Sequence, residues 1–284
     1  MEKIFVIKNE FGINLDHTFD CGQCFRFDKV GDSDYDVEYR GVAFGRAVSF
    51  AQKGDELYVI GSDGDEFEKI WRRFLSLDED YGAIHGELAS LSDNKALHRA
   101  IEYGKGIRIL RQDPWEAICS FIISQNNNIP RIKGLIRALS ERAGERLADG
   151  VYSFPTAQAV ADLGVDELRA LKVGFRAPYI LDAAEKVSSG KLDVSAVASL
   201  STKDAEKLLC TVKGIGPKVA DCALLFGFSK YDAFPVDVWM KRVIEKYFDP
   251  TFAPESLGRY AGIAQQVLFY YERWCGDREG AAAL

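Results

Sequence analysis

Hydrophobic and polar residues alternate along the first sixty positions of the chain, which is the pattern of strands with one buried face. Short breaks that contain glycine separate the alternating stretches. Such a succession is typical of an antiparallel meander, in which consecutive strands are joined by turns. The pattern predicts strands at 3–7, 24–27, 36–39, 43–50 and 56–60.

After residue 64 the hydrophobic period lengthens to that of a helix. Most of the remaining chain consists of helical stretches joined by short connections, which is typical of a compact helical bundle. We therefore expect an α+β fold, with an N-terminal antiparallel twisted sheet domain and flanking helices over 1–95 and a larger all-helical domain over 96–284. Helices are predicted at 65–75, 81–91, 96–103, 114–124, 129–143, 157–163, 166–171, 177–188, 203–210, 217–228, 238–247 and 254–274.

Composition narrows the class of protein. Hydrophobic residues make up 47% of the 284 positions and charged residues 28%, which is ordinary for a soluble globular chain. No apolar run approaches the roughly 18 residues that a membrane span needs. The first residues are too short and too interrupted by charges for a signal peptide. We expect a cytoplasmic protein with no membrane partner.

Cysteine and histidine usage excludes several kinds of site. Only two cysteines have metal-ligand spacing, and no four-cysteine run near the C-terminus could hold an iron–sulfur cluster. All three histidines lie in the first third of the chain, which excludes histidine-dependent catalysis in the C-terminal half. Reduced thiols are therefore expected at Cys21, Cys24, Cys119, Cys210, Cys222 and Cys275.

One glycine-containing segment lies between two predicted helices, at Gly214-Ile215-Gly216 within 203–228. Glycines allow close backbone approach, and the following helix N-terminus presents free amides that suit a phosphate. This is the helix-hairpin-helix pattern, which contacts a DNA backbone without reading its sequence. The chain carries a formal charge of −7, which argues mildly against a nucleic-acid partner, but residues 201–246 hold eight Lys/Arg and six Asp/Glu. A plain glycine-rich turn remains the alternative interpretation.

Two further residues bear on that choice. Lys218 occupies the second position of the predicted helix, where the helix dipole and partial burial disfavour the ammonium form. A neutral amine is a nucleophile. Asp237 precedes another predicted helix, so it is either an N-cap, a functional carboxylate that faces Lys218, or both. Taken singly, each residue is more simply explained as a solvated lysine and a helix cap.

The segments 214–222 and 235–238 together resemble the helix-hairpin-helix DNA glycosylases, with their Gly/Pro-rich loop and catalytic aspartate. Within that superfamily the resemblance is to the bifunctional 8-oxoguanine DNA glycosylases with lyase activity. Further blocks similar to this family occur at 21–26, 110–132, 174–177 and 264–269. The resemblance implies removal of 8-oxoguanine, preferably opposite cytosine, from double-stranded DNA by a monomer, in a prokaryotic cytoplasm at the nucleoid.

The resemblance implies roles for individual residues. Lys218 would attack the sugar C1′ and form a Schiff base, and Asp237 would stabilise the cationic sugar. The Gly22 carbonyl would accept the N7 proton that distinguishes 8-oxoguanine from guanine. The flipped base would also contact Cys222, Gln265 and Phe269. Cys21 and Cys24 would flank the base-binding loop and bind no metal. Asn126 would enter the space left by the flipped base, and Phe175 would insert as a wedge beside the opposite cytosine. Arg131 and Arg176 would donate hydrogen bonds to that cytosine.

The resemblance also implies backbone contacts and a structural ion. DNA phosphates would meet Lys213, Gly214, Gly216 and Lys241. No cofactor is required, but a monovalent cation would bind the hairpin carbonyls of Cys210, Val212 and Ile215. Trp239 departs from the animal enzymes, which carry a histidine after the catalytic aspartate, so the phosphate contact of that histidine is not expected here. Positive potential is expected around Lys213, Lys218, Lys241 and Arg242.

Three other functions compete with this interpretation. A related glycosylase for another lesion is the nearest, although the missing cysteine cluster and the presence of Lys218 weigh against the thymine-glycol, adenine and alkylbase types. A non-enzymatic DNA-binding module would need neither Lys218 nor Asp237. A small-molecule enzyme would need a phosphate loop, a metal set or a cofactor fingerprint, and the sequence supplies none.

Overall fold

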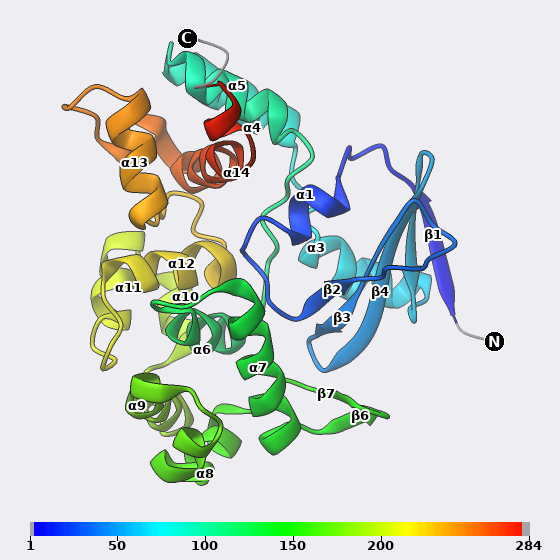
Figure 1. The fold of residues 1–284 in the computed structure, drawn as a ribbon, viewed down its shortest axis with the longest axis vertical. Coiled ribbons are helices and arrows are strands. Elements are labelled where there is room, and N and C mark those ends of the chain that lie inside the picture. Colours follow the sequence, from blue (N-terminus) through cyan, green and yellow to red (C-terminus); the bar gives the residue numbers. More distant parts are fainter. Residues whose placement is uncertain (1–2, 280–284) are drawn as a thin grey trace.

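The computed structural model describes residues 3–279, in which an antiparallel sheet is followed by a largely helical part (Figure 1). The strands lie in the order β1-β5-β4-β3-β2 across the sheet. Their bounds are β1 Ile4–Lys8, β2 Phe27–Lys29, β3 Val37–Ala43, β4 Arg46–Lys53 and β5 Glu56–Ile60. The expected α+β fold, an antiparallel sheet followed by a larger helical domain, is confirmed.

Helices dominate the chain after the sheet. One short helix, α1 Leu15–Phe19, lies between β1 and β2. Three short elements directly follow β5: α2 Gly64–Glu66, the π-helical turn η1 Phe67–Trp71 and α3 Arg72–Phe74. The α-helices that follow are α4 Tyr81–Leu91, α5 Lys95–Tyr103, α6 Pro114–Ser124, α7 Ile129–Ala143, α8 Ala157–Ala170, α9 Ala177–Ser188, α10 Val194–Ser199, α11 Thr202–Leu209, α12 Pro217–Phe228, α13 Val238–Tyr247 and α14 Ala261–Glu279. The helical part also contains two 3-10 turns, η2 Gly174–Arg176 and η3 Pro254–Tyr260. It includes one β-hairpin, formed by β6 Arg146–Ala148 and β7 Val151–Tyr152.

An aromatic core holds the sheet to the helical turns that cover it. The Phe50 ring lies 5.7 Å from that of Phe27 and 5.5 Å from that of Trp71, between their centroids. Gly41 on β3 permits the close approach of β2, because a Cβ there would lie 2.4 Å from the Arg26 carbonyl oxygen. This contact helps to position the 21–26 loop that precedes β2.

Helix α6 forms the centre of the helical part, and its residues 115–123 are all buried. It packs on α12, and the two helices approach so closely that a Cβ at Gly227 would lie 2.7 Å from the Cβ of Ala117. Helix α14 packs against α5 and α13. The N-terminus of α12 is thereby held by a rigid framework.

Several predicted element boundaries were wrong, for local reasons. The strand expected at 24–27 begins only at Phe27, because residues 21–26 form a loop held by side-chain hydrogen bonds. The two helices expected at 157–163 and 166–171 are confirmed, because the non-helical Gly164, with φ +69°, separates two helical stretches within α8. The helix expected at 254–274 begins instead as the 3-10 turn η3, which Gly258 interrupts with φ +69°, and the α-helix starts only at Ala261. Helix α1 and the β6–β7 hairpin were not predicted.

The domain division at 95/96 stays a prediction. Helix α4, which precedes that division, contributes Tyr81, Ile84 and Leu88 to the same buried cluster as α6 and α12. Among residues 3–279, no helix is both long enough and apolar enough to cross a membrane.

Candidate active site

A groove of about 940 Å³ runs past the α12 N-terminus, and a smaller pocket opens beside it. The groove is bounded by the loop between α6 and α7, by the start of α12 and by the segment that leads into α13. Groove and pocket share the lining residues Gly22, Phe121, Lys218, Asp237 and Phe269. Four of these five residues were predicted as site residues, although they are up to 247 positions apart in the chain.

Lys218, Cys222 and Asp237 form one electrostatic cluster at this point. Gly216 is the N-cap of α12, so Lys218 lies in its first turn and Cys222 follows one turn later. The side chains of Lys218 and Asp237 are close enough to the Cys222 thiol to influence its pKa. Burial raises the pKa of Cys222 to about 11, and the Lys218 charge opposes that rise while the Asp237 charge adds to it. The cysteine is thus a protonated packing group, and Lys218 is the candidate nucleophile beside it.

Asp237 is held by its role as a helix cap. Its Oδ1 accepts the backbone N–H of Met240 at 2.8 Å, at the start of α13. A capping carboxylate keeps one orientation, so its negative charge is fixed at the wall of the groove and pocket. Both sequence interpretations of Asp237, cap and site carboxylate, are therefore compatible with its position.

The loop that carries Gly22 is fixed from both sides. Gln23 donates to the Arg108 carbonyl at 2.8 Å and accepts the Leu110 N–H at 2.8 Å. Gln266 of α14 donates to the Cys21 carbonyl at 2.8 Å. Gly22 itself has φ +80°, a conformation that favours glycine. Burial raises the pKa of the Cys21 and Cys24 thiols to about 12, in keeping with a structural role.

Gln265 supplies the most direct sign of a ligand. Its side chain lines the small pocket and is 5% exposed, yet its Oε1 has no hydrogen-bond partner. A buried unpaired acceptor is costly unless a ligand satisfies it. Phe269 lies one turn further along α14, and its Cε1 is 3.8 Å from the point where a Gly22 Cβ would lie. The pocket therefore combines an unpaired amide oxygen with an aromatic wall.

Of the residues predicted to meet the opposite base, two line the groove and two, Arg131 and Arg176, do not. Asn126 and Phe175 line it, with Asn126 at φ +47° and Phe175 53% exposed. Arg176 is buried and donates to the backbone carbonyls of Gln125, Asn126 and Val173, so here it positions the Asn126 loop. The charge of Arg131 contributes to the lowered pKa of Arg176, after the larger effect of burial, so these two guanidinium groups are neighbours. Their contact with cytosine stays a prediction.

The hairpin before α12 is anchored to α9. Gly214 has φ +81°, and a Cβ there would lie 2.2 Å from the Tyr179 ring. The Lys213 N–H donates to Asp182 of α9 at 2.7 Å. Gly216 and Lys241 line the groove, whereas Lys213 and Gly214 are not among its lining residues. The carbonyls proposed for a cation lie in this turn, where Val212 also accepts the Ile215 N–H at 3.1 Å.

Sequence reasoning missed several lining residues. Phe25, Phe121, Val238 and Arg273 border the groove as well. Arg273 could have been found, because it follows Phe269 by four positions and so shares its helical face. Phe25 and Phe121 gave no separate signal, since their hydrophobicity is equally explained by the core.

Comparison with known proteins supports this assembly. Residues 3–118 match the 8-oxoguanine DNA glycosylase N-terminal domain, and residues 119–252 match the HhH-GPD superfamily of base excision DNA repair proteins. The N-glycosylase/DNA lyase OGG1 of Arabidopsis thaliana is 28% identical, over 92% of this chain and 77% of its own length.

Solved structures extend the similarity to the whole fold. The apo 8-oxoguanine glycosylase/lyase of Clostridium acetobutylicum is 36% identical with a TM-score of 0.88, covering 95% of this chain and 98% of that one. Its complex with double-stranded DNA that contains cytosine opposite 8-oxoguanine is 36% identical with a TM-score of 0.86, covering 96% and 97%. The resemblance expected from the sequence is confirmed, and the chain belongs to the 8-oxoguanine DNA glycosylase/lyase family of the HhH-GPD superfamily.

Proposed function

We propose that this chain excises 8-oxoguanine paired with cytosine from double-stranded DNA and then nicks the strand by its lyase activity. The observation that carries the proposal is the placement of Lys218 and Asp237 on the wall of a pocket that also holds the unpaired Gln265 oxygen. An amine, a fixed carboxylate and an unpaired amide oxygen on one pocket support this proposal. Among the described residues no His/Cys/Asp/Glu cluster offers a metal site.

Base recognition begins with extrusion of the damaged nucleotide, because its C1′ is inaccessible within the stack. The Gly22 carbonyl would accept the N7 proton that guanine lacks. Gln265 would meet the pairing edge of the base, and its unpaired Oε1 accepts from a base N–H. Phe269 and Cys222 would pack against the two faces. A guanine at this position would leave the Gly22 carbonyl unmatched, at a cost of about 1–3 kcal/mol.

The chemistry follows from the two polar groups. The neutral Lys218 amine attacks C1′, and the bond to the base breaks with its electron pair passing to the base, which then takes up a proton. Positive charge develops on the sugar as this bond breaks, and the fixed Asp237 carboxylate stabilises it. The sugar ring opens to a Schiff base on Nζ. Loss of a C2′ proton then expels the 3′ phosphate and nicks the strand.

The remaining predicted residues would serve the opposite strand and the backbone. Asn126 would fill the space left by the extruded base, Phe175 would wedge beside it, and Arg131 and Arg176 would favour cytosine. Amides of the hairpin and Lys241 would hold phosphates, with a monovalent cation on the hairpin carbonyls. The enzyme would act as a monomer, on chromosomal DNA in a prokaryotic cytoplasm.

Borohydride trapping tests the proposal. A duplex with one 8-oxoguanine opposite cytosine is incubated with borohydride and with wild type, Lys218→Gln or Lys69→Gln; Lys69 is an exposed control on η1. We expect a covalent adduct with wild type and Lys69→Gln and none with Lys218→Gln. An adduct that survives in Lys218→Gln would assign another amine. No adduct and no base release, with retained duplex binding, would overturn the lyase activity.

A further inference from the structure

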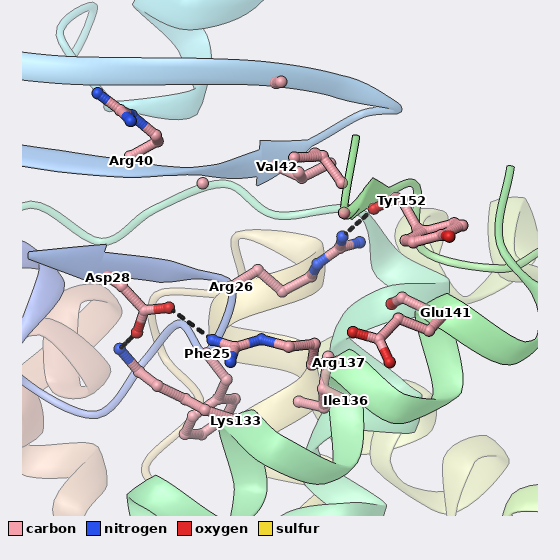
Figure 2. A pocket seen from close by; sticks show the side chains of 15 residues that line it. Phe25, Arg26, Asp28, Arg40, Val42, Lys133, Ile136, Arg137, Glu141 and Tyr152 are labelled. Atoms are coloured by element: carbon pink, nitrogen blue, oxygen red, sulfur yellow. Dashed lines mark hydrogen bonds and ion pairs between the residues drawn. The ribbon is translucent and has the colours of Figure 1, made fainter. Parts of the chain in front are cut away.

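A second cavity, of about 200 Å³, lies where the sheet meets α7 and the β6–β7 hairpin (Figure 2). Arg26, from the segment that leads into β2, forms part of its lining, and Arg137 and Glu141 reach it from α7. Val42 of β3 and Tyr152 of β7 close it from the other sides. Except for Phe25, no residue of this lining belongs to the groove or to the small pocket. The cavity is therefore distinct from the site of base excision.

Two buried polar atoms of this lining have no hydrogen-bond partner. The Arg26 side chain is 8% exposed, and its Nη1 makes no hydrogen bond. Ser140, on the same wall as Arg137, is 2% exposed, and its Oγ makes no hydrogen bond either. Both groups are donors, and buried donors are nearly always satisfied. Their presence in one cavity points to an acceptor that binds there.

The orientation of Arg26 is fixed by its neighbours. Its other terminal nitrogen donates to the Tyr152 carbonyl, as Figure 2 shows. Its guanidinium lies 5.9 Å from the centre of the Phe154 ring. The guanidinium therefore cannot leave the cavity wall without breaking these contacts. Arg26 is a preformed donor for a ligand and not a mobile surface side chain.

The charge of Arg26 is incompletely balanced within the protein. Glu116 lies 3.9 Å away, beyond hydrogen-bond distance, and burial raises the pKa of Glu116 to about 7. The other cations of the lining have closer partners. Lys133 and Arg137 bind Asp28 at 2.8 and 3.0 Å, and Arg40 binds Glu38 at 3.2 Å. Glu141 is the second acidic residue of the lining. The surplus charge thus resides on the buried Arg26.

We propose that this cavity binds a small oxyanion, a carboxylate or phosphate carried on a compact apolar body, with its oxygens on Arg26 and Ser140. A guanidinium and a hydroxyl are suitable donors for such an oxyanion. The apolar walls at Phe25, Val42, Ile136 and Val151 would receive the rest of the molecule. An occupant would contact Phe25, which also lines the groove and packs on Phe121 with ring centres 5.7 Å apart. The ligand would therefore lie directly behind the loop that holds Gly22.

Ligand-observed NMR titration tests this site on the full chain. Benzoate and phenyl phosphate are the probes, and they distinguish the two kinds of oxyanion; benzamide is the neutral isostere. We expect saturable binding of at least one anion, with benzamide bound about tenfold more weakly or not at all. Ser140→Ala should weaken the anion about threefold or more, because one hydrogen bond to a charged ligand is lost. Arg26→Met should abolish binding.

Two further variants make the result decisive. Arg142→Gln changes an exposed charge on α7 that does not line the cavity, and it should leave binding unchanged. Lys218→Gln should also leave it unchanged, which separates the cavity from the groove. If Arg26→Met fails to fold, Ser140→Ala alone carries the test. The proposal is overturned if neither anion saturates, if benzamide binds equally well, or if Ser140→Ala binds like wild type; water alone would then satisfy both donors.

Discussion

At the scale of single residues, the site places its charges by giving its side chains a second, structural contact. Asp237 is oriented because it caps α13, and Lys218 lies near the Cys222 thiol, whose pKa its charge lowers. Gln265 is the exception, since its Oε1 is buried without a partner. In the proposed reaction the Asp237 carboxylate would therefore need no reorganisation as positive charge develops on the sugar, whereas the Gln265 amide oxygen would gain its hydrogen-bond partner only when a base binds.

Asp237→Asn separates the two functions of this side chain. Asparagine is as good an N-cap as aspartate, so the stability of the protein should stay within about 0.5 kcal/mol of wild type. The lost negative charge should lower the excision rate by about a hundredfold or more. Single-turnover excision and urea unfolding, measured on the same preparation, check both halves. Asp237→Ala is the matched variant, since it loses the cap as well and should be destabilised by about 1 kcal/mol. A parallel loss of rate and stability in Asp237→Asn would contradict this separation.

Trp239 carries a second residue-scale prediction. It lines the groove beside Asp237, is 42% exposed, and has the Arg242 guanidinium 5.3 Å from its ring centre. An exposed aromatic in a DNA groove gains stacking energy on binding, about 1–3 kcal/mol per base. Trp239→Ala should therefore weaken duplex binding about tenfold or more while leaving thermal stability nearly unchanged. Trp274→Ala, at a similarly exposed ring outside the groove, should leave the dissociation constant unchanged in fluorescence anisotropy. Equal losses in both variants would refute a specific role.

At the scale of elements, α12 carries Lys218 at the groove and a carboxyl group with a raised pKa, Asp221, one turn further along. Asp221 lies between Lys218 and the middle of the helix, and burial raises its pKa to about 7, with the charges of Glu206 and Asp232 adding to the rise. The native state thus keeps a proton that the unfolded chain, with an ordinary pKa of 3.8, has lost. The contribution of Asp221 to the free energy of unfolding is therefore fully present below about pH 4 and is lost as the pH rises through about 7.

Asp221→Asn should abolish that loss. We expect it to raise the free energy of unfolding at pH 8 by about 2 kcal/mol and to change it little at pH 4. Urea unfolding at the two pH values provides the measurement. Asp204→Asn on α11 is the control, because Ser201 and Lys207 lower the pKa of that exposed carboxyl, so no gain at pH 8 is expected. An equal gain at both pH values would point to a packing effect and away from titration.

Local signals explain which elements could be predicted. The hairpin before α12 could be predicted because glycine and proline, here Gly214, Gly216 and Pro217, are typical of tight turns and helix starts. The β6–β7 hairpin was missed because it is short and its contact with Arg26 joins residues 126 positions apart. The catalytic pair was named through the resemblance, whereas the Arg26–Ser140 cavity has no local signature. Long-range contacts of this kind form only in the folded chain, so neither hydrophobic periodicity nor a sequence motif predicts them.

At the scale of the whole molecule, the question is how an acidic protein attracts DNA. The chain carries −7, yet the groove is lined by Lys218, Lys241 and Arg273 against the single carboxylate of Asp237. The positive potential expected around four residues stays a prediction; of these, Lys218 and Lys241 line the groove, while Lys213 and Arg242 lie outside its lining. The excess of negative charge lies elsewhere, where it opposes unspecific association and leaves the groove as the favourable approach.

This distribution predicts how binding responds to salt. Each phosphate that a lysine or arginine neutralises contributes about −0.9 to the slope of log K against log salt concentration. Lys241→Gln should therefore weaken binding to lesion-containing and undamaged duplexes alike and make the slope shallower by about 1. Lys69→Gln, on η1 of the sheet part, removes the same charge away from the groove and should leave the slope unchanged. Anisotropy titrations at several salt concentrations provide both slopes. If the two variants behaved alike, net charge would govern binding, and the groove would have no privileged role.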